Sequence, residues 1–509
     1  MRKIFTNGNI YTVTNGNAEA FVEEEGKFIY VGNNERALSY KQEDSEIIDL
    51  QNKFVTAGFN DSHMHVVEFG DYLEMMHMGD FTSSLKELKE GIRKFINEKN
   101  LKENEWARGR GWNNDYFTDE NRFPTRYDLD EVSTTCPICI IRACGHICVV
   151  NSKGLELLGI TKDSPQVEGG VFDVDENGEP LGIFRENALE LVYSKALTPD
   201  KESFKKMIHE ACRALNSYGV TSAQTDDFVA FPQVDYEVLI AAYQELEKEG
   251  KLTVKINQQA QLVNIEDLKE FIGKGYKTGV GSDYFKIGPL KLIGDGSLGA
   301  RTAYMTQPYN DDDSTCGIPI YTQEQLDEMV VVIHCIGDKI MYMVVEAMEK
   351  ALKKYPKEDH RHGIVHCQIT TKELLDKFKE LKLHAYIQSI FLDYDINIVE
   401  DRIGKERAKY TYNFKTLMDS GVITSNGSDC PVELPNVMNG MQCAVTRKNL
   451  DGKGPFLPEQ ALSVEEAIKS YTIMGAYGSF EEKTKGSIEI GKVCDFVVLG
   501  QNPFEVEKD

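Results

Sequence analysis

Short apolar runs recur through the middle of the chain, and stretches with helical periodicity lie between most of them. Such runs predict buried strands, and strands that alternate with helices predict βαβ units in a parallel sheet. We count eight candidate strands, at residues 54–63, 219–225, 252–259, 284–293, 329–334, 363–366, 383–388 and 421–426. Helical patterns include residues 324–329, 338–355, 371–381 and 412–421. This pattern predicts an α/β fold, a (β/α)8 TIM barrel with its active site at the C-terminal ends of the strands.

The first two candidate strands are separated by far more chain than the roughly 30 residues of one βα unit. The excess predicts an inserted α+β domain at residues 73–198, which leaves residues 56–72 and 199–459 for the barrel. The insertion contains a helical pattern at 87–99, a strand-like run at 135–143 and a hairpin that turns at Asn177-Gly178. We expect it to lie over the barrel mouth and to shape a substrate pocket.

Both ends of the chain contain short strand-like runs and turns. Turns are predicted at Asn7-Gly8 and Asn15-Gly16, a hairpin-like pair between Gly486 and Gly491, and a strand at 495–500. We therefore expect residues 1–55 and 460–509 to form one small β-sandwich, in which pairing covers the sheet edges.

Charge and composition exclude several classes of protein. A net charge of -25 argues against nucleic acid or anionic membranes as partners. No apolar run approaches the roughly 18 residues of a membrane span, and the N-terminal apolar stretch is too short for a signal peptide. Eleven cysteines without a small-domain spacing pattern indicate reduced thiols. We expect a soluble cytoplasmic protein that acts on a small molecule.

Side chains that bind metals follow the predicted strands. His63 and His65 form His-x-His at the end of the first strand, where alternation places both imidazoles on one side. His334, His366 and Asp429 lie at or just after the ends of later strands. Nitrogen and oxygen donors of this kind suit Zn²⁺ or a similar divalent ion, and Mn²⁺, Fe²⁺ and Ni²⁺ accept them too.

These donors outnumber the three protein ligands that one catalytic zinc needs, so the site has room for one or two ions. Two ions need a bridging anion. Lys291, inside the fourth strand, supplies one if CO₂ converts its amine to a carbamate. The alternative is that Lys291 pairs with Asp295, and the sequence leaves both interpretations open.

Two sequence patterns in the insertion resemble the motifs of other metal sites. Cys136 and Cys139, followed by Cys144 and Cys148, resemble a zinc or iron-sulfur site, but their apolar surroundings favour packed thiols. The stretch that begins at Asp173 resembles an EF-hand loop, yet its twelfth position is Phe184 where calcium requires a glutamate. We interpret it as a hairpin.

The chain resembles the amidohydrolase superfamily, and more closely its amidohydrolase-3 branch, which is YtcJ-like and N-substituted formamide deformylase-like. The resemblance covers nearly the whole chain. The most specific stretches are DGSLGARTA, HCIGD and GSDCPV, and GFNDSHMH, RGRGWNNDYF and RACGHICVVNSKGL also match.

This resemblance implies a barrel with an attached β-sandwich, and a homodimer. It implies metal ligation by His63, His65, His334, His366 and Asp429. Lys291 matches the lysine that is carboxylated in many relatives, and Lys286 is the second choice. In this chain HCIGDKI and RHGIVHCQ stand where relatives more usually have HAIGDRA and RIEHAQ. These differences leave the ligand residues in place, and we expect them to alter the pocket near the metal.

The resemblance also implies catalytic and substrate-binding residues. Asp429 would move a proton between a metal-activated water and the leaving nitrogen, and His366 would polarise the carbonyl. The residues in branch motifs that would line the substrate cavity are His146, Trp112, Asn113, Glu186 and Arg301. Arg142 and Asp338 could line the cavity too, but a structural ion pair or a helix cap explains them equally well.

The favoured function is hydrolysis of a carbon-nitrogen bond other than a peptide bond, in an amide, N-substituted formamide or cyclic amide. Hydrolysis of esters, lactones or phosphoesters is a second hypothesis, because the same activated water attacks them. A third is a non-catalytic regulatory or binding protein that retains the metal, although it would have no need of the proton shuttle Asp429.

Overall fold

In the computed structural model of the chain, the described residues are 1–120, 122–143, 145–196, 198–231, 233–329 and 332–507. They form two compact units. One comprises Met1–Glu68, Ile208–Ala230 and Tyr243–Asp509, and the other comprises Phe69–Met207 and Phe231–Ala242. The N-terminal strands and the barrel thus belong to one unit. The residue boundaries predicted above for the β-sandwich, the barrel and the inserted domain stay predictions.

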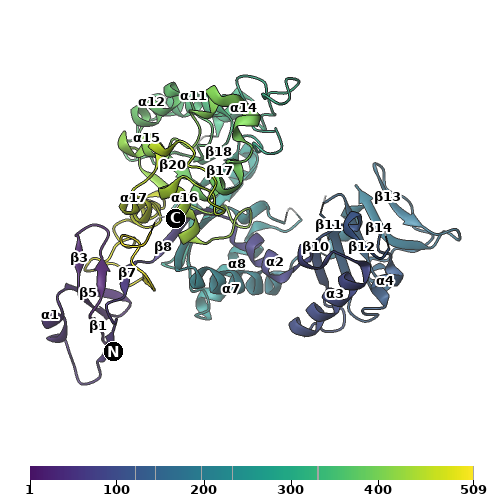
Figure 1. Cartoon of the computed structure of the whole chain (residues 1–509), viewed down its shortest axis with the longest axis horizontal. Helices are drawn as coiled ribbons and strands as arrows, with labels where there is room; N and C mark the ends of the chain where they lie inside the picture. The colour runs from purple at the N-terminus through teal and green to yellow at the C-terminus, as the bar shows by residue number, and fades with distance from the viewer. Residues whose placement is uncertain (121, 144, 197, 232, 330–331, 508–509) are drawn as a thin grey trace. The chain divides into compact units, whose positions relative to one another are not determined.

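The first unit is built on a parallel sheet of eight strands in the order β21-β20-β19-β18-β17-β16-β15-β8. Figure 1 labels β8, β17, β18 and β20 of this sheet. The strands are β8 (Phe59–Met64), β15 (Val220–Thr225), β16 (Lys255–Gln261), β17 (Phe285–Ile293), β18 (Val332–Cys335), β19 (Gly363–His366), β20 (His384–Ile387) and β21 (Thr424–Asn426). Each corresponds to one predicted strand, although residues 330–331 of the fifth lie outside the described residues. The TIM-barrel prediction is confirmed.

Helices occupy the connections, as the periodicity predicts. They include α7 (Lys201–Ser217), α8 (Tyr236–Lys248), α9 (Ile265–Gly273), α10 (Gln323–Glu328), α11 (Asp338–Lys354), α12 (Lys372–Leu381), α14 (Val399–Ala408), α15 (Phe414–Asp419) and α16 (Val437–Thr446). In α11 the buried face repeats at helical spacing through Ile340, Met341, Val344 and Met348.

The loop after β21 returns to β8 and brings the last strand of the sheet beside the first. The backbone N–H of Asp429 donates to the carbonyl of His63 at 2.8 Å, and that of His65 donates to the carbonyl of Cys430 at 2.8 Å. Two of the expected ligand segments are therefore fastened together directly.

The predicted first strand is two strands in the structure. β7 (Phe54–Ala57) ends before Gly58 and belongs to a four-stranded sheet in the order β22-β7-β2-β3, whereas β8 enters the barrel. A second small sheet has the order β5-β4-β1-β6. The other strands of the two sheets are β1 (Lys3–Thr6), β2 (Asn9–Tyr11), β3 (Asn17–Ala18), β4 (Ala20–Glu24), β5 (Lys27–Gly32), β6 (Glu46–Asp49) and β22 (Phe496–Leu499).

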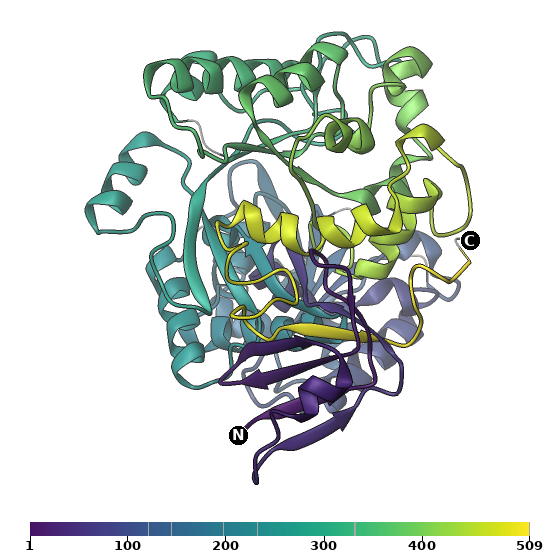
Figure 2. The same ribbon diagram turned by 90° about the vertical axis from the view of Figure 1, so that its left-hand side faces the viewer.

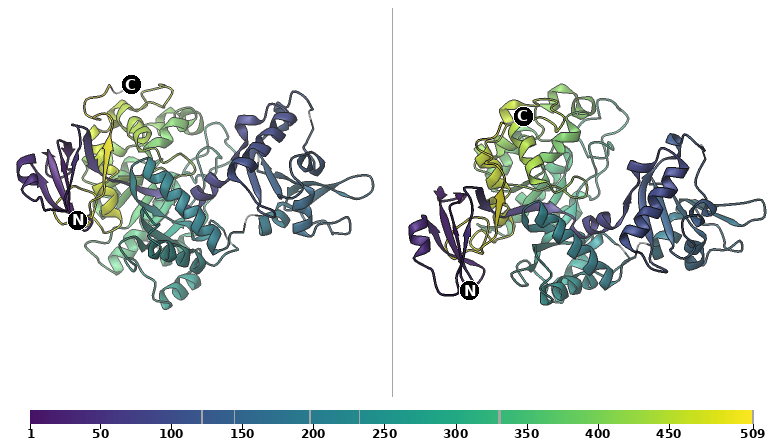
Figure 3. Two further views of the ribbon diagram at one scale, coloured as in Figure 1. Left: turned by 90° about the horizontal axis from the view of Figure 1, so that it is seen from below. Right: turned by 60° about the horizontal axis from the view of Figure 1, so that its bottom comes forward.

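The two ends of the chain meet in these sheets. β22 pairs antiparallel with β7, and Phe496 packs its ring against Phe5 and Phe21 at centroid distances of 5.1 and 5.0 Å. Figures 2 and 3 show the yellow C-terminal strand beside the purple N-terminal strands. The strand predicted at 495–500 is confirmed.

The hairpin-like pair predicted between Gly486 and Gly491 is wrong. This segment bonds to the turn before β5 and to β5 itself: Gly491 N–H donates to the Phe28 carbonyl at 2.8 Å, and Cys494 N–H donates to the Gly26 carbonyl at 2.7 Å. The partner strand comes from the other end of the chain, and local turn signals do not indicate such pairing. Residues 464–478 are also mostly helical, in α17 (Val464–Ser470) and α18 (Ile473–Gly478).

The second unit contains a six-stranded mixed sheet in the order β13-β14-β12-β11-β10-β9. Its strands are β9 (Met76–His77), β10 (Ala107–Trp112), β11 (Ile138–Arg142), β12 (Ile147–Val150), β13 (Gly170–Val174) and β14 (Pro180–Glu186). Its helices include α3 (Leu85–Lys99), α4 (Arg126–Asp130), α5 (Ser152–Leu158) and α6 (Leu189–Ala196). The α+β character predicted for the insertion is confirmed, and its place over the barrel mouth stays a prediction.

The two imitations of metal sites in this unit have structural explanations. Asp175 accepts hydrogen bonds from the backbone N–H groups of Asn177 and Glu179, and so shapes the turn of the β13–β14 hairpin. Cys139 and Cys148 are free, buried thiols on β11 and β12, and Cys136 is also buried. Cys144 lies outside the described residues. None of the helices within the described ranges has the length and hydrophobicity needed to span a bilayer.

Candidate metal centre

The barrel brings together the ligands expected from the sequence. His63 lies in β8 and His65 directly follows that strand, Lys291 lies in β17, and His334 and His366 lie in β18 and β19. Asp429 lies three residues after β21. Because the carboxyl ends of parallel strands meet at one end of a barrel, residues far apart in the chain become neighbours there.

Three of these residues converge on one point. The Nε2 atoms of His63 and His65 each lie 3.1 Å from Oδ1 of Asp429. Each of the three residues offers one ligand atom, and these atoms all lie within 4.8 Å of one another. Among the described residues, this is the group of histidine, cysteine and acidic side chains placed to hold a metal ion. Two imidazole nitrogens and a carboxylate oxygen are the donors that zinc and related ions accept, so this set fits a divalent metal.

His334 and His366 form a second donor pair beside the first. Nε2 of His366 lies 2.7 Å from Nδ1 of His334, and the rings of His63 and His366 are 5.5 Å apart. The face of the His366 imidazole is stacked on Phe391, with ring centroids 5.6 Å apart. Phe391 belongs to the short 3-10 helix η4 (Ser389–Phe391), which follows β20.

Lys291 is fully buried beside both donor groups. Its Nζ lies 2.6 Å from Oδ2 of Asp226, a residue that immediately follows β15. The Lys291–Asp295 pair considered from the sequence is absent from the contacts of the described residues. Asp295 instead accepts backbone N–H groups of Tyr304, Ile336 and Gly337, and so holds the loop after β17 in place.

Lys286, the second choice for the carboxylated lysine, makes a different contact. It lies near the start of β17, and its Nζ pairs with Glu481 at 2.6 Å. Of the two lysines, Lys291 is therefore the one in contact with the residues around the candidate centre.

Burial and neighbouring charges set the protonation of the centre. Burial lowers the pKa of His334 to about 4, with a contribution from the Lys291 ammonium. Burial also lowers the pKa of His366 well below its usual value, and the neighbouring His334 adds to this. Both imidazoles are thus neutral at physiological pH, which is the form that binds a metal.

The carboxylates have the opposite effect. Burial opposes charge on His65, but Asp226 and Asp429 outweigh it and raise the pKa of His65 well above its usual value. Burial likewise opposes ionisation of Asp429, yet His63 and His65 hold the pKa of this carboxyl well below its usual range. Without metal, Asp429 is therefore an ionised carboxylate between two imidazoles.

Sequence reasoning missed two aspartates of this region. Asp61 accepts hydrogen bonds from the backbone N–H groups of His63 and Ser428 and, at 2.6 Å, from the Ser428 hydroxyl, so it ties β8 to the Asp429 loop. Asp226 contacts Lys291 and, through Oδ1 at 2.9 Å, Nδ1 of His65. Both lie in or directly after a barrel strand, and this position is the signal that would have found them.

The predicted substrate-binding residues of the second unit have varied surroundings. His146 and Glu186 form an exposed hydrogen bond, with Nδ1 3.0 Å from Oε2. Asn113 caps η2 (Asn114–Tyr116) and accepts a hydrogen bond from Arg142, which also pairs with Asp115. The structural role considered for Arg142 is therefore present, and substrate contacts by His146, Glu186 and Asn113 stay predictions.

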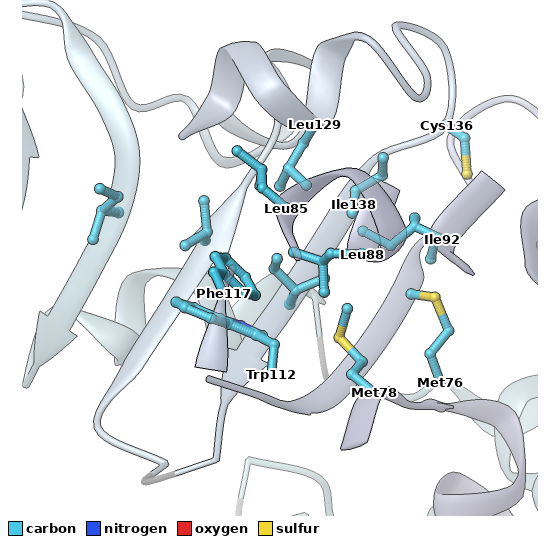
Figure 4. Close-up of a cluster of buried hydrophobic side chains, with 14 residues drawn as sticks. Met76, Met78, Leu85, Leu88, Ile92, Trp112, Phe117, Leu129, Cys136 and Ile138 are labelled. Carbon is cyan, nitrogen blue, oxygen red and sulfur yellow. The ribbon is translucent and has the colours of Figure 1, made fainter. Parts of the chain in front are cut away.

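Trp112 has different surroundings. Its indole is fully buried in the hydrophobic core of the second unit, near Phe117 and Leu88 (Figure 4). Contact with a substrate would require that core to open, so we assign Trp112 a packing role.

Arg301 lies in the first unit, on the loop after β17. Its guanidinium pairs with Asp311 at 2.8 Å, and its contact with a substrate stays a prediction. Asp338 is the first residue of α11 and accepts hydrogen bonds from the backbone N–H and the hydroxyl of Thr306. It ties the loop after β17 to this helix, whereas the N-cap of α11 is Gly337 and not Asp338.

The candidate centre lies at the carboxyl ends of the strands of an eight-stranded parallel barrel, where TIM-barrel enzymes have their active sites. Its histidine and aspartate donors suit a metal-dependent hydrolase. Residues 46–509 match the model of the Amidohydrolase family, and the chain belongs to this family.

Known relatives match this chain over nearly its full length. The YtcJ protein of Bacillus subtilis (strain 168) is 31% identical to this chain, and the match covers 100% of this chain and 96% of YtcJ. N-substituted formamide deformylase of Arthrobacter pascens is 24% identical to this chain, and the match covers 98% of this chain and 93% of the deformylase. A crystal structure of a metal-dependent hydrolase from Pyrococcus furiosus superposes with a TM-score of 0.81 and 29% identity, and the match covers 99% of this chain and 100% of the other.

Proposed function

We propose that this protein hydrolyses a carbon-nitrogen bond other than a peptide bond, in a small amide, N-substituted formamide or cyclic amide. The observation that carries the proposal is the position of Asp429, an ionised carboxylate in contact with the Nε2 atoms of both His63 and His65. Family membership and the similarity to an N-substituted formamide deformylase support the choice of bond.

The donor set indicates which residues would hold metal. His63, His65 and Asp429 would hold one ion, and His334 and His366 would take part in holding a second, with Lys291 as a carbamate bridge. Zinc is the ion that we propose. When bound, such an ion polarises a scissile carbonyl and lowers the pKa of a water molecule to about 7.

The chain's own residues would then handle the proton. Asp429 would accept a proton from the attacking water and deliver it to the leaving nitrogen, because its carboxylate is ionised and buried at the centre. If it is not fully committed to metal, His366 would orient the carbonyl oxygen, with its ring stacked on Phe391.

The test is an assay panel of N-formyl amines, hydantoins and aryl esters, with D429N as the matched variant. We expect turnover of at least one amide substrate and its loss in D429N by a factor of about 10² to 10⁴, the range for removal of a general acid-base group. Turnover of esters alone would favour the ester and lactone hypothesis. No turnover by either protein, with metal present, would favour a regulatory or binding protein.

We also propose a homodimer in the cytoplasm. The free cysteines support a reducing compartment: all ten in the described residues are unpaired with one another. The homodimer rests on the family resemblance, and gel filtration with light scattering tests it.

A further inference from the structure

Asp226 is a fully buried aspartate whose two oxygens contact two different residues of the centre. Oδ1 lies 2.9 Å from Nδ1 of His65, and Oδ2 lies 2.6 Å from Nζ of Lys291. The residue follows β15, a strand for which we expected no ligand.

The contact with His65 determines which ring nitrogen is free. A carboxylate at Nδ1 requires a hydrogen on that nitrogen, so in the neutral ring the lone pair lies on Nε2. Nε2 is the atom that lies 3.1 Å from Oδ1 of Asp429, where the first donor set converges.

We propose that Asp226 is a positioning residue of the metal centre, which fixes the tautomer and ring orientation of His65 and holds Lys291 beside the same centre. The proposal rests on the proposed function, since it assumes a metal at the point where His63, His65 and Asp429 converge. Carboxylates that orient ligand histidines in this way typically change metal affinity 10- to 100-fold when they are removed.

Asp227 provides a matched control. It is adjacent in sequence and equally buried, but its carboxylate hydrogen-bonds to the Thr225 hydroxyl. D226N keeps the shape of the side chain but has one acceptor oxygen for two donors. Its amide group therefore must face either Nδ1 of His65 or the Lys291 amine.

The experiment measures Zn²⁺ affinity by chelator competition for full-length wild type, D226N and D227N, with circular dichroism as a check on folding. We expect D226N to bind about 10- to 100-fold more weakly than wild type, and D227N to bind within about threefold of it. The visible spectrum of the Co²⁺-substituted protein should also change in D226N, because the coordination of His65 changes.

D226N leaves Lys291 without its carboxylate, so it risks a folding defect that has nothing to do with His65. Comparing K291M with D226N/K291M removes this difficulty, since neither variant then buries an unpaired lysine charge. Weaker binding in the double variant would support the role through His65. Equal binding in that pair, or wild-type affinity and spectrum in D226N, would overturn the proposal. If wild type itself bound no metal, the proposed function would fail first, and this inference with it.

Discussion

At the residue scale, the backbone is strained at two of the expected ligands. His366 has φ 75° and Asp429 has φ 59°, a left-handed conformation that is unfavourable for side chains with a Cβ. Such residues cost on the order of 1–3 kcal/mol each and persist where the surrounding structure imposes them, often at functional sites. The packing around the site therefore imposes the backbone conformation of both residues.

Gly427 limits how the Asp429 loop fits against β8. A Cβ at this position would lie 2.6 Å from the backbone nitrogen of His63 and 2.8 Å from Oδ1 of Asp61. We expect G427A to separate the loop from β8 and to weaken Zn²⁺ binding on the order of tenfold, as changes in groups that orient ligands do. G273A is the control, because a Cβ there meets nothing within 4 Å. Equal affinities in the two variants would show that this contact does not position the ligands.

At the element scale, β17 carries a lysine toward each end. Lys291 contacts the candidate centre, whereas Lys286 shares Glu481 with Lys485, with both Nζ–oxygen distances at 2.6 Å. Burial opposes ionisation of Glu481, but Lys485 and Lys286 outweigh it and lower its pKa to about 2. This ion cluster joins the C-terminal segment to the barrel strand.

The Glu481 cluster makes a pH-dependent contribution to stability. Because the folded pKa is below the unfolded one, its stabilisation is present above about pH 4.5 and is lost as the pH falls toward 2. The shift corresponds to about 3 kcal/mol. We expect E481Q to lower the free energy of unfolding by roughly that amount at pH 7, since it also leaves two lysines unpaired.

Urea denaturation of wild type and E481Q at pH 7 and at about pH 3.5 measures this effect. The difference between the two proteins should shrink at the lower pH, where the wild-type glutamate is mostly protonated in the unfolded chain but still ionised in the folded protein. A difference that stays constant between these pH values would contradict the assigned pKa.

At the scale of the whole molecule, the barrel could be predicted because short apolar runs mark strands such as β17, β18, β19 and β20, and because helices separate the runs. The histidines and Asp429 could be predicted from their places after those runs. The contacts of Asp226 could not, since its position after a strand marks a candidate ligand but is equally typical of a turn or cap. The 486–491 segment could not either, because its partners lie at the other end of the chain.

The most direct measurement is metal content per chain, on protein purified without chelator and grown with and without added bicarbonate, beside the H63A/H65A variant. The two donor groups predict about two equivalents of metal per wild-type chain. Added bicarbonate should raise this metal content if Lys291 is carboxylated. The H63A/H65A variant should lose the metal. About one equivalent, unchanged by bicarbonate, would contradict the second donor group and the carbamate. Wild-type protein that retains no metal, even after incubation with zinc, would contradict the metal centre itself.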